Sequence, residues 1–294
     1  MSPCAYYKPV ARPGVFPLFV FAVSAVLHVL FLVVVLAYAA ATALSVRAVG
    51  QAEDAGRKLA IRTLALAAVL QAVELVVAWA WLGGESMRGA ALPLGLFAVV
   101  LSGGFAAFAT KYRAETAGVL VAPASLVAGV LSAASSHGTP VGSSGFVWAL
   151  PLHVVTVSTA SGVMGLAAAL AFLYQTQDRR LKRKDLSIPP RALVPLDVLD
   201  RTVGRLSYAA FFAYTLAVVA GVFMLRQGHV PQRVVLWRGV TGMGTWLLYG
   251  GVVAHRVVFR AHGSRAMRSV VFGFLLSMVI FGAYATLAAG AVNR

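Results

Sequence analysis

The sequence predicts an all-α integral membrane protein, a single domain over residues 1–294 that folds as a transmembrane bundle of eight helices. The first observation is composition: 60% of the residues are hydrophobic, only 12% are charged, and the mean hydropathy is +0.84, outside the range of ordinary soluble domains. The second is length, because eight apolar runs reach the roughly 20 residues that cross a bilayer core of about 30 Å. The third is pattern, because these runs are too long for barrel strands and do not alternate apolar with polar residues.

The runs follow one another along the chain. The expected helices cover residues 16–42, 62–82, 91–110, 117–134, 147–174, 204–225, 234–256 and 269–290. The first run is much longer than the core of a signal peptide, so it predicts a retained helix. The one long connection, residues 175–203, is expected to be a loop of bases and prolines, with a short interfacial helix after Pro195.

The charge of the chain, +16, is distributed in a way that predicts topology. Most of the 25 lysines and arginines lie in every second connection, including residues 175–203. By the positive-inside rule these connections are cytoplasmic, so both termini are expected outside. The bases orient the helices and attract anionic lipid. A nucleic-acid partner is not expected, because the sequence has no folded basic domain to bind it. Cys4 is the only cysteine, which excludes internal disulfides, a CxxC pair and a covalent CxxCH haem site.

One carboxyl group, Glu74, falls inside an expected transmembrane run. Gln71 lies three residues before it, on the same helical face. A carboxylate at this depth must be protonated, paired or hydrated. The favoured interpretation is a structural ion pair with Arg238 of the seventh run, and a proton-relay role is the alternative.

Three histidines also fall within expected helices. His153 lies about six residues into the fifth, His255 at the inner end of the seventh and His28 in the first. An imidazole in a bundle is often only an interhelical hydrogen-bond partner, but ionisable groups at membrane depth are uncommon enough to suggest function. Small residues, Gly251 and Gly244, share the face of His255 and leave room for another helix or a planar ligand.

These segments resemble a known family. The three that carry the resemblance are "LHVVTVSTASGVMGLAAALAFLYQTQDRRLKRK", "PPRALVPLDVLDRTVGRLSY" and "WLLYGGVVAHRVVFRAHGSRAMRSVVFGFLLSMVIFGAY". They are similar to the cytochrome c assembly family (CcsA/CcmC-like), whose members bind and handle haem, and most similar to its eight-helix members of the HemX type. The resemblance covers residues 147–284, and over the first four helices it extends only to helix count.

The resemblance implies a site for non-covalent haem b. It implies that His153 is an outward-facing haem ligand and that His255 is a second one, with Trp246 as a neighbouring aromatic. His153 and His255 are expected at opposite ends of their helices, roughly 20 Å or more apart at 1.5 Å per residue, so they do not share one iron. His153 would pair with His229 or another outer imidazole (His137, or His28 if the first helix starts late), and His255 with His262 or a non-histidine ligand.

One departure from the family pattern bears on function. The family's haem-delivering members carry a tryptophan-rich outer segment between the sixth and seventh helices, where this chain has Trp237 alone. The expected function is therefore haem handling for c-type cytochrome biogenesis without that haem-presenting motif, in a bacterial inner membrane. An enzyme is not expected, because the sequence shows no nucleophile with a base, no phosphate-binding loop and no carboxylate pair.

Two other functions stay open at this point. The first is a HemX-like regulator or scaffold of tetrapyrrole biosynthesis, whose cytoplasmic loop 175–203 recruits a soluble enzyme or a cytochrome c assembly partner. The second is a small-molecule transporter, which is favoured if Glu74 and the glycines of the seventh helix line one cavity.

Overall fold

The computed structural model describes residues 16–50, 54–82, 90–112, 114, 117–135, 149–184, 194–227 and 232–292, and over these residues it is all-helical, with eight helices and no strand. The helices are α1 (Phe16–Gly50), α2 (Asp54–Leu82), α3 (Ala91–Tyr112), α4 (Gly118–Ala134), α5 (Ala149–Lys182), α6 (Leu196–Gln227), α7 (Gln232–Val257) and α8 (Ser264–Val292). The predicted fold class is confirmed in its coarse form, and each of the eight predicted runs overlaps one helix.

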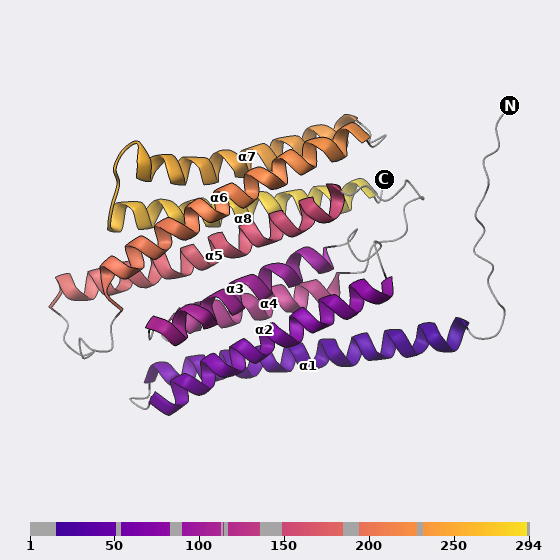
Figure 1. Ribbon diagram of the computed structural model, residues 1–294, viewed down its shortest axis with the longest axis horizontal. Coiled ribbons are helices and arrows are strands. Elements are labelled where there is room, and N and C mark those ends of the chain that lie inside the picture. The colour runs from indigo at the N-terminus through magenta and orange to yellow at the C-terminus, as the bar shows by residue number, and fades with distance from the viewer. Residues whose placement is uncertain are drawn as a thin grey trace.

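The helices lie side by side and alternate in direction (Figure 1). The C-terminal ends of α1, α3, α5 and α7 therefore all lie at one end of the bundle, on the left in Figure 1. We call this end the basic end, because the described lysines and arginines concentrate there. They include Arg47, Arg57, Lys58, Arg62, Lys111, Arg179, Arg180, Lys182, Arg256, Arg260, Arg265 and Arg268.

Six of the helices, within the described residues, are long and apolar enough to cross a membrane: α1, α2, α3, α5, α6 and α8. Large apolar side chains cover their outward faces, for example Leu36 at 59% exposure, Val76 at 62% and Val279 at 65%. Such exposure is costly in water and favourable in lipid. The helices therefore indicate an integral membrane protein in a bilayer.

Two predictions about the connection 175–203 are wrong. α5 runs on to Lys182, and the residues after Pro195 form the first turns of α6 rather than a separate interfacial helix. The extra turns carry (i, i+4) ion pairs, Lys182 with Asp178 and Arg201 with Asp197, which stabilise a helix in water. An apolar run marks only the part of a helix that lies in the bilayer, and the helix itself can continue into water.

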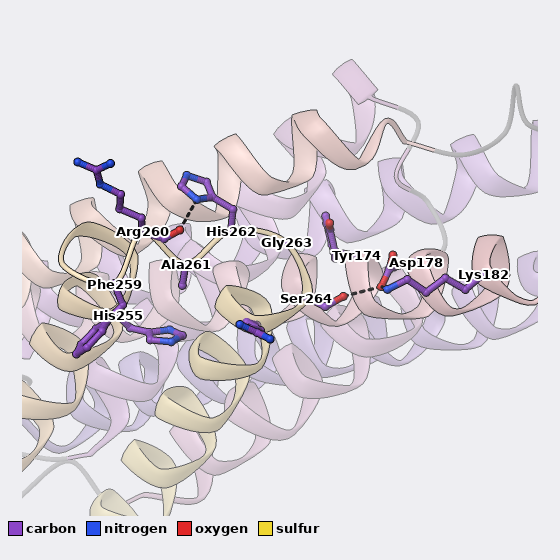
Figure 2. A pocket seen from close by; sticks show the side chains of 11 residues that line it. Tyr174, Asp178, Lys182, His255, Phe259, Arg260, Ala261, His262, Gly263 and Ser264 are labelled. Atoms are coloured by element: carbon purple, nitrogen blue, oxygen red, sulfur yellow. Dashed lines mark hydrogen bonds and ion pairs between the residues drawn. The ribbon is translucent and has the colours of Figure 1, made fainter.

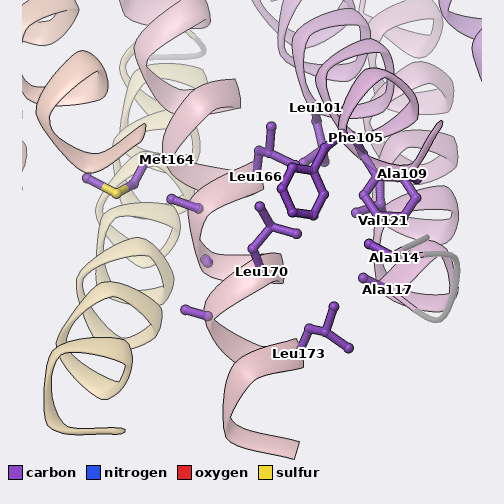
Figure 3. Packing of buried hydrophobic residues seen from close by; sticks show 14 of the residues in the cluster. Leu101, Phe105, Ala109, Ala114, Ala117, Val121, Met164, Leu166, Leu170 and Leu173 are labelled. Carbon is purple, nitrogen blue, oxygen red and sulfur yellow. The ribbon is translucent and has the colours of Figure 1, made fainter. Parts of the chain in front are cut away.

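α5 is the central helix. It packs against α6, α3 and α8, and two-thirds of its apolar window is buried. On one side Leu166 and Leu170 meet Phe105 of α3, while Met164 points toward the opposite side of the helix (Figure 3). The contact of α5 with α3 joins the helices α1–α4, which we call the N-terminal half, to α5–α8, the C-terminal half.

Glycine permits the close approach of α5 to α3. A Cβ atom on Gly162 would lie 2.8 Å from Val100 Cβ and 3.2 Å from the carbonyl oxygen of Phe97. Backbone cannot give way as a flexible side chain can, so Gly162→Ala is expected to destabilise the protein by about 1–3 kcal/mol. Thermal unfolding in detergent measures the effect.

Gly242→Ala is the matched control for that substitution. A Cβ atom there meets nothing within 4 Å, and alanine is the better helix former, so the melting temperature should stay the same or rise. Equal melting temperatures for Gly162→Ala and Gly242→Ala would contradict the packing described.

Candidate functional site

A cavity of about 710 Å³ opens at the basic end between α5 and the turn that joins α7 to α8. α5 contributes Tyr174, Asp178 and Lys182, and the turn contributes residues 259–265 (Figure 2). His255, in the last turn of α7, also lines the cavity. The volume lies in the range of small-molecule sites, which is about 300–1,000 Å³.

The proton position on His255 follows from its partner. Its Nδ1 lies 3.2 Å from Ser269 Oγ, and that hydroxyl donates its own hydrogen to the carbonyl oxygen of Ala266 at 2.8 Å. The serine oxygen is therefore the acceptor, and Nδ1 carries the proton. In the neutral imidazole this leaves the lone pair on Nε2, the arrangement in which a histidine ligates a metal while its other nitrogen is held by the protein.

The turn between α7 and α8 is held in a tight conformation. Arg260 and Gly263 both have positive φ, 48° and 66°. A Cβ atom on Gly263 would also lie 3.2 Å from the Tyr174 hydroxyl, so both the backbone conformation and the close contact favour glycine here. Ser264 Oγ donates to the Asp178 carboxylate, which also pairs with Lys182 Nζ at 2.7 Å. The cavity is thus bounded by a turn fastened to α5.

The electrostatics of the cavity are basic. Lys182, Arg260 and Arg265 line it, against the single carboxylate of Asp178. Asp178 is already paired with Lys182, and among the described residues no carboxylate forms an ion pair with Arg260 or Arg265. The surplus positive charge favours a ligand that carries acidic groups.

A buried ion pair fixes the end of α7 against α6. Arg256 Nη2 lies 2.7 Å from Asp200 Oδ1, and the arginine side chain is only 8% exposed. A Cβ atom on Gly204 would lie 2.6 Å from Arg256 Nη1, so the guanidinium occupies space that glycine leaves open. The pair joins two of the segments that carry the family resemblance. It holds Arg256, the residue directly after His255, against α6.

His153 lies at the other end of the C-terminal half. Its Nδ1 is 2.7 Å from the carbonyl oxygen of Ala217 in α6, and because a carbonyl only accepts, Nδ1 is the donor. The ring packs against Gly221, where a Cβ atom would lie 3.1 Å from Nδ1. The half-buried imidazole therefore bridges α5 and α6 and, like His255, has the Nε2 lone pair available in its neutral form.

The two histidines are well separated. His153 contacts α6 at Ala217, whereas Arg256, next to His255, contacts α6 at Asp200. The 17 residues between these contacts correspond to about 25 Å of helix. One iron cannot bind both imidazoles, as the sequence predicted.

The other predicted ligand-binding residues do not join either histidine. Trp246 packs on Phe211 at 5.7 Å between ring centroids and donates from Nε1 to Thr215 Oγ1 at 3.0 Å, so it fastens α7 to α6. Nine residues, or two and a half turns, place it on the opposite face of α7 from His255. His28 is exposed on α1, which packs against α2 and α4, far from His153. His229 and His137 lie outside the described residues.

Glu74 has a different neighbour from the one predicted. Gln71 Nε2 donates to its Oε2. α2 packs against α1, α3 and α4, on the opposite side of the bundle from α7 (Figure 1), so the expected pair with Arg238 is not supported. The glycines of α7 are also remote from Glu74, and a Cβ atom on Gly251 meets nothing within 4 Å. Glu74 and these glycines therefore line no common cavity.

The sequence interpretation missed the cavity itself. It gave His262 as a possible partner of His255 but did not group the arginines of the turn with them, yet His262, Arg260 and Arg265 share one cavity with His255. His262 Nδ1 donates to the carbonyl oxygen of Arg260 at 2.6 Å, and its ring is exposed. The available signal was the sequence HRVVFRAHGSR, in which two histidines and three arginines fall within eleven residues.

Comparison with known proteins finds no matching family model, no matching curated protein and no matching solved structure. Among the described residues, no three histidine, cysteine or acidic side chains cluster as a metal site.

Proposed function

We propose that this chain is a haem-binding integral membrane protein of the cytochrome c assembly type, which handles haem b for c-type cytochrome biogenesis. The observation that carries the proposal is His255: an imidazole with Nδ1 bonded to Ser269, beside a basic cavity at one end of the bundle. A haem held there would take its axial nitrogen from His255, and its two propionates would be matched by Arg260 and Arg265.

Two features of the cavity and one of α7 support the fit. The volume of the cavity suits a small planar ligand, its charge suits the propionates, and the exposed face at Gly251, one turn before His255, is open to a flat group. A bound haem would supply an iron for ligand binding, and His262, the imidazole nearest to His255 in sequence, would be a second residue able to hold it. The chain itself binds, orients and neutralises the group.

The visible spectrum of the protein tests the proposal. The full chain purified in detergent from a haem-replete host should show a Soret band, and apoprotein titrated with hemin should saturate at a stoichiometric ratio. Colourless protein that does not respond to added hemin would contradict the proposal.

The proposed topology has all eight helices crossing the bilayer with both termini outside. α4 and α7 lie alongside the six helices that are long and apolar enough to cross a membrane, and the bases gather at one end, which the positive-inside rule assigns to the cytoplasm. In a Cys4→Ser background, Ser187→Cys should resist a membrane-impermeant maleimide on intact cells and react in inverted vesicles. Ser144→Cys should behave in the opposite way. Labelling of the Ser187→Cys variant on intact cells would invert the topology.

A scaffold for a soluble enzyme of tetrapyrrole synthesis is the second candidate function. α5 and α6 have 34 and 32 residues, about 50 Å each, and therefore extend well beyond a bilayer core of about 30 Å. Arg179, Arg180 and Lys182 lie on the projecting turns of α5. A pull-down with residues 183–195 intact or replaced by a neutral linker distinguishes a scaffold from a haem carrier, because only a scaffold would lose its partner.

A further inference from the structure

We infer that Glu74 is an intramembrane proton-binding site, built by the N-terminal half and separate from the haem site proposed above. The carboxyl group would take up and release a proton within the bilayer, and Gln71 would be its hydrogen-bond partner in both states.

Glu74 lies within the membrane-crossing part of its helix. Glu74 lies in the apolar window Ala55–Ala80 of α2, 12 residues or about 18 Å beyond Arg62. It shares a helical face with Gln71 and Ala78, which are 1% and 7% exposed. Glu74 itself is half-buried, so its carboxyl group lies at the edge of the contacts of α2 with its neighbours.

Among the described residues of the neighbouring helices, no countercharge lies at the depth of Glu74. α2 packs against α1, α3 and α4. In their described parts, the ionisable side chains of α1 are His28, Tyr38 and Arg47, those of α3 are Lys111 and Tyr112, and α4 has none. Arg47, Lys111 and Tyr112 lie at the basic end, and His28 lies ten residues, about 15 Å, from Tyr38 in the other direction. An ionised Glu74 would have no cation beside it, which favours the protonated acid.

Gln71 carries both a hydrogen-bond donor and an acceptor. Its Nε2 donates to Glu74 Oε2, as a carboxylate requires, while its Oε1 is buried without a hydrogen-bond partner among the described residues. When Glu74 is protonated, its carboxyl group has one hydrogen to donate. The amide oxygen of Gln71 can accept that hydrogen after the amide turns over. Gln71 can thus satisfy either state, so that the proton can exchange.

Gly129 and Tyr38 lie beside this amide. A Cβ atom on Gly129 of α4 would lie 3.2 Å from Gln71 Oε1 and 3.5 Å from the ring of Tyr38. Tyr38 itself is completely buried and donates to Ser102 Oγ at 3.1 Å, because that hydroxyl gives its hydrogen to the carbonyl oxygen of Ala98. Tyr38 is also within electrostatic range of Glu74. The site is therefore a polar cluster in an otherwise apolar half.

Labelling with a hydrophobic carbodiimide tests the inference on the full chain in detergent. The reagent needs the acid form, because the acid proton moves to the carbodiimide nitrogen while the carboxyl oxygen adds to its central carbon. Mass spectrometry of the tryptic peptide 63–88 should show labelling at mildly acidic pH that declines as pH rises. Labelling should be lost in Glu74→Gln and kept in Glu85→Gln, the matched control in the same peptide.

Further variants and salts separate the alternatives. Gln71→Leu removes the donor to the carboxylate and should move the decline to higher pH, whereas Gln177→Leu, an equally buried glutamine of α5, should not. Exchange of sodium for choline chloride should have no effect. Absence of labelling at every pH would overturn the inference, and protection by sodium would assign the site to a metal cation instead.

The result is independent of haem binding. Glu74→Gln should leave the hemin titration unchanged, and an unaltered elution profile of that variant would show that it folds. Failure of the carbodiimide test with an intact Soret band would reject the proton site alone.

Discussion

The variant His255→Ala should lose haem from the basic end of the bundle. The imidazole is the axial nitrogen of the proposed site, and alanine supplies no ligand in its place. We expect hemin affinity to fall by at least about 100-fold, since loss of an outer hydrogen bond to a metal-ligating histidine alone typically costs 10- to 100-fold. The readouts are the Soret amplitude of the purified protein and the hemin titration of apoprotein.

Graded controls separate ligation from folding. Ser269→Ala removes only the acceptor for His255 Nδ1–H, so affinity should fall by about 10-fold and the Soret position should shift. His28→Ala, on the exposed face of α1, should bind hemin as the unmodified protein does. Equal titrations for all three variants would show that His255 is only a helix-packing residue.

The helices were predictable from the sequence because a bilayer imposes one length on every crossing. Each predicted apolar run overlaps one helix, and the boundaries of α3 and α4 differ by at most two residues. The largest boundary errors are at the basic ends of α1, α2, α5 and α6, where charged residues border the apolar run. There, ion pairs such as that of Asp178 with Lys182 extend the helix into water, which a hydropathy criterion does not detect.

Helix neighbours were not predictable, because periodicity defines a buried face but not the helix that covers it. Glu74 and Arg238 were matched by depth alone, yet α2 and α7 lie on opposite sides of the bundle. For the same reason Trp246, which the resemblance assigned to haem, packs on Phe211 instead. The positions of His153 and His255 at opposite ends were predictable, since both follow from residue counts along helices of known rise.

The contact between Asp200 and Arg256 was also beyond the sequence. Both residues lie in segments quoted for the family resemblance, but they are 56 positions apart in the sequence, and nothing in it indicates that they meet. Gly204, one turn after Asp200, is intelligible only when the guanidinium that lies against it is known. Tertiary packing thus gives these motif residues a physical role that their pattern alone did not suggest.

Removal of the Asp200 charge should be the most destabilising of the conservative changes proposed. Asp200→Asn leaves the guanidinium of Arg256, only 8% exposed, without its counterion. Breaking a buried ion pair from one side costs about 3–5 kcal/mol, and the 20% exposure of the Asp200 side chain places the expected loss at the lower end. Unfolding in detergent, followed by intrinsic tryptophan fluorescence, measures it.

Asp197→Asn, one turn earlier on α6, is the matched control. Its pair with Arg201 is exposed on both sides, at 68% and 70%, so its loss should cost less than about 1 kcal/mol. The double variant Asp200→Asn, Arg256→Met should recover most of the stability, because it removes the uncompensated charge together with its partner. If instead Asp197→Asn and Asp200→Asn were equally stable, Arg256 would be hydrated and α7 would not depend on this pair. Because Arg256 follows His255 directly, hemin affinity should fall with stability in Asp200→Asn and return in the double variant.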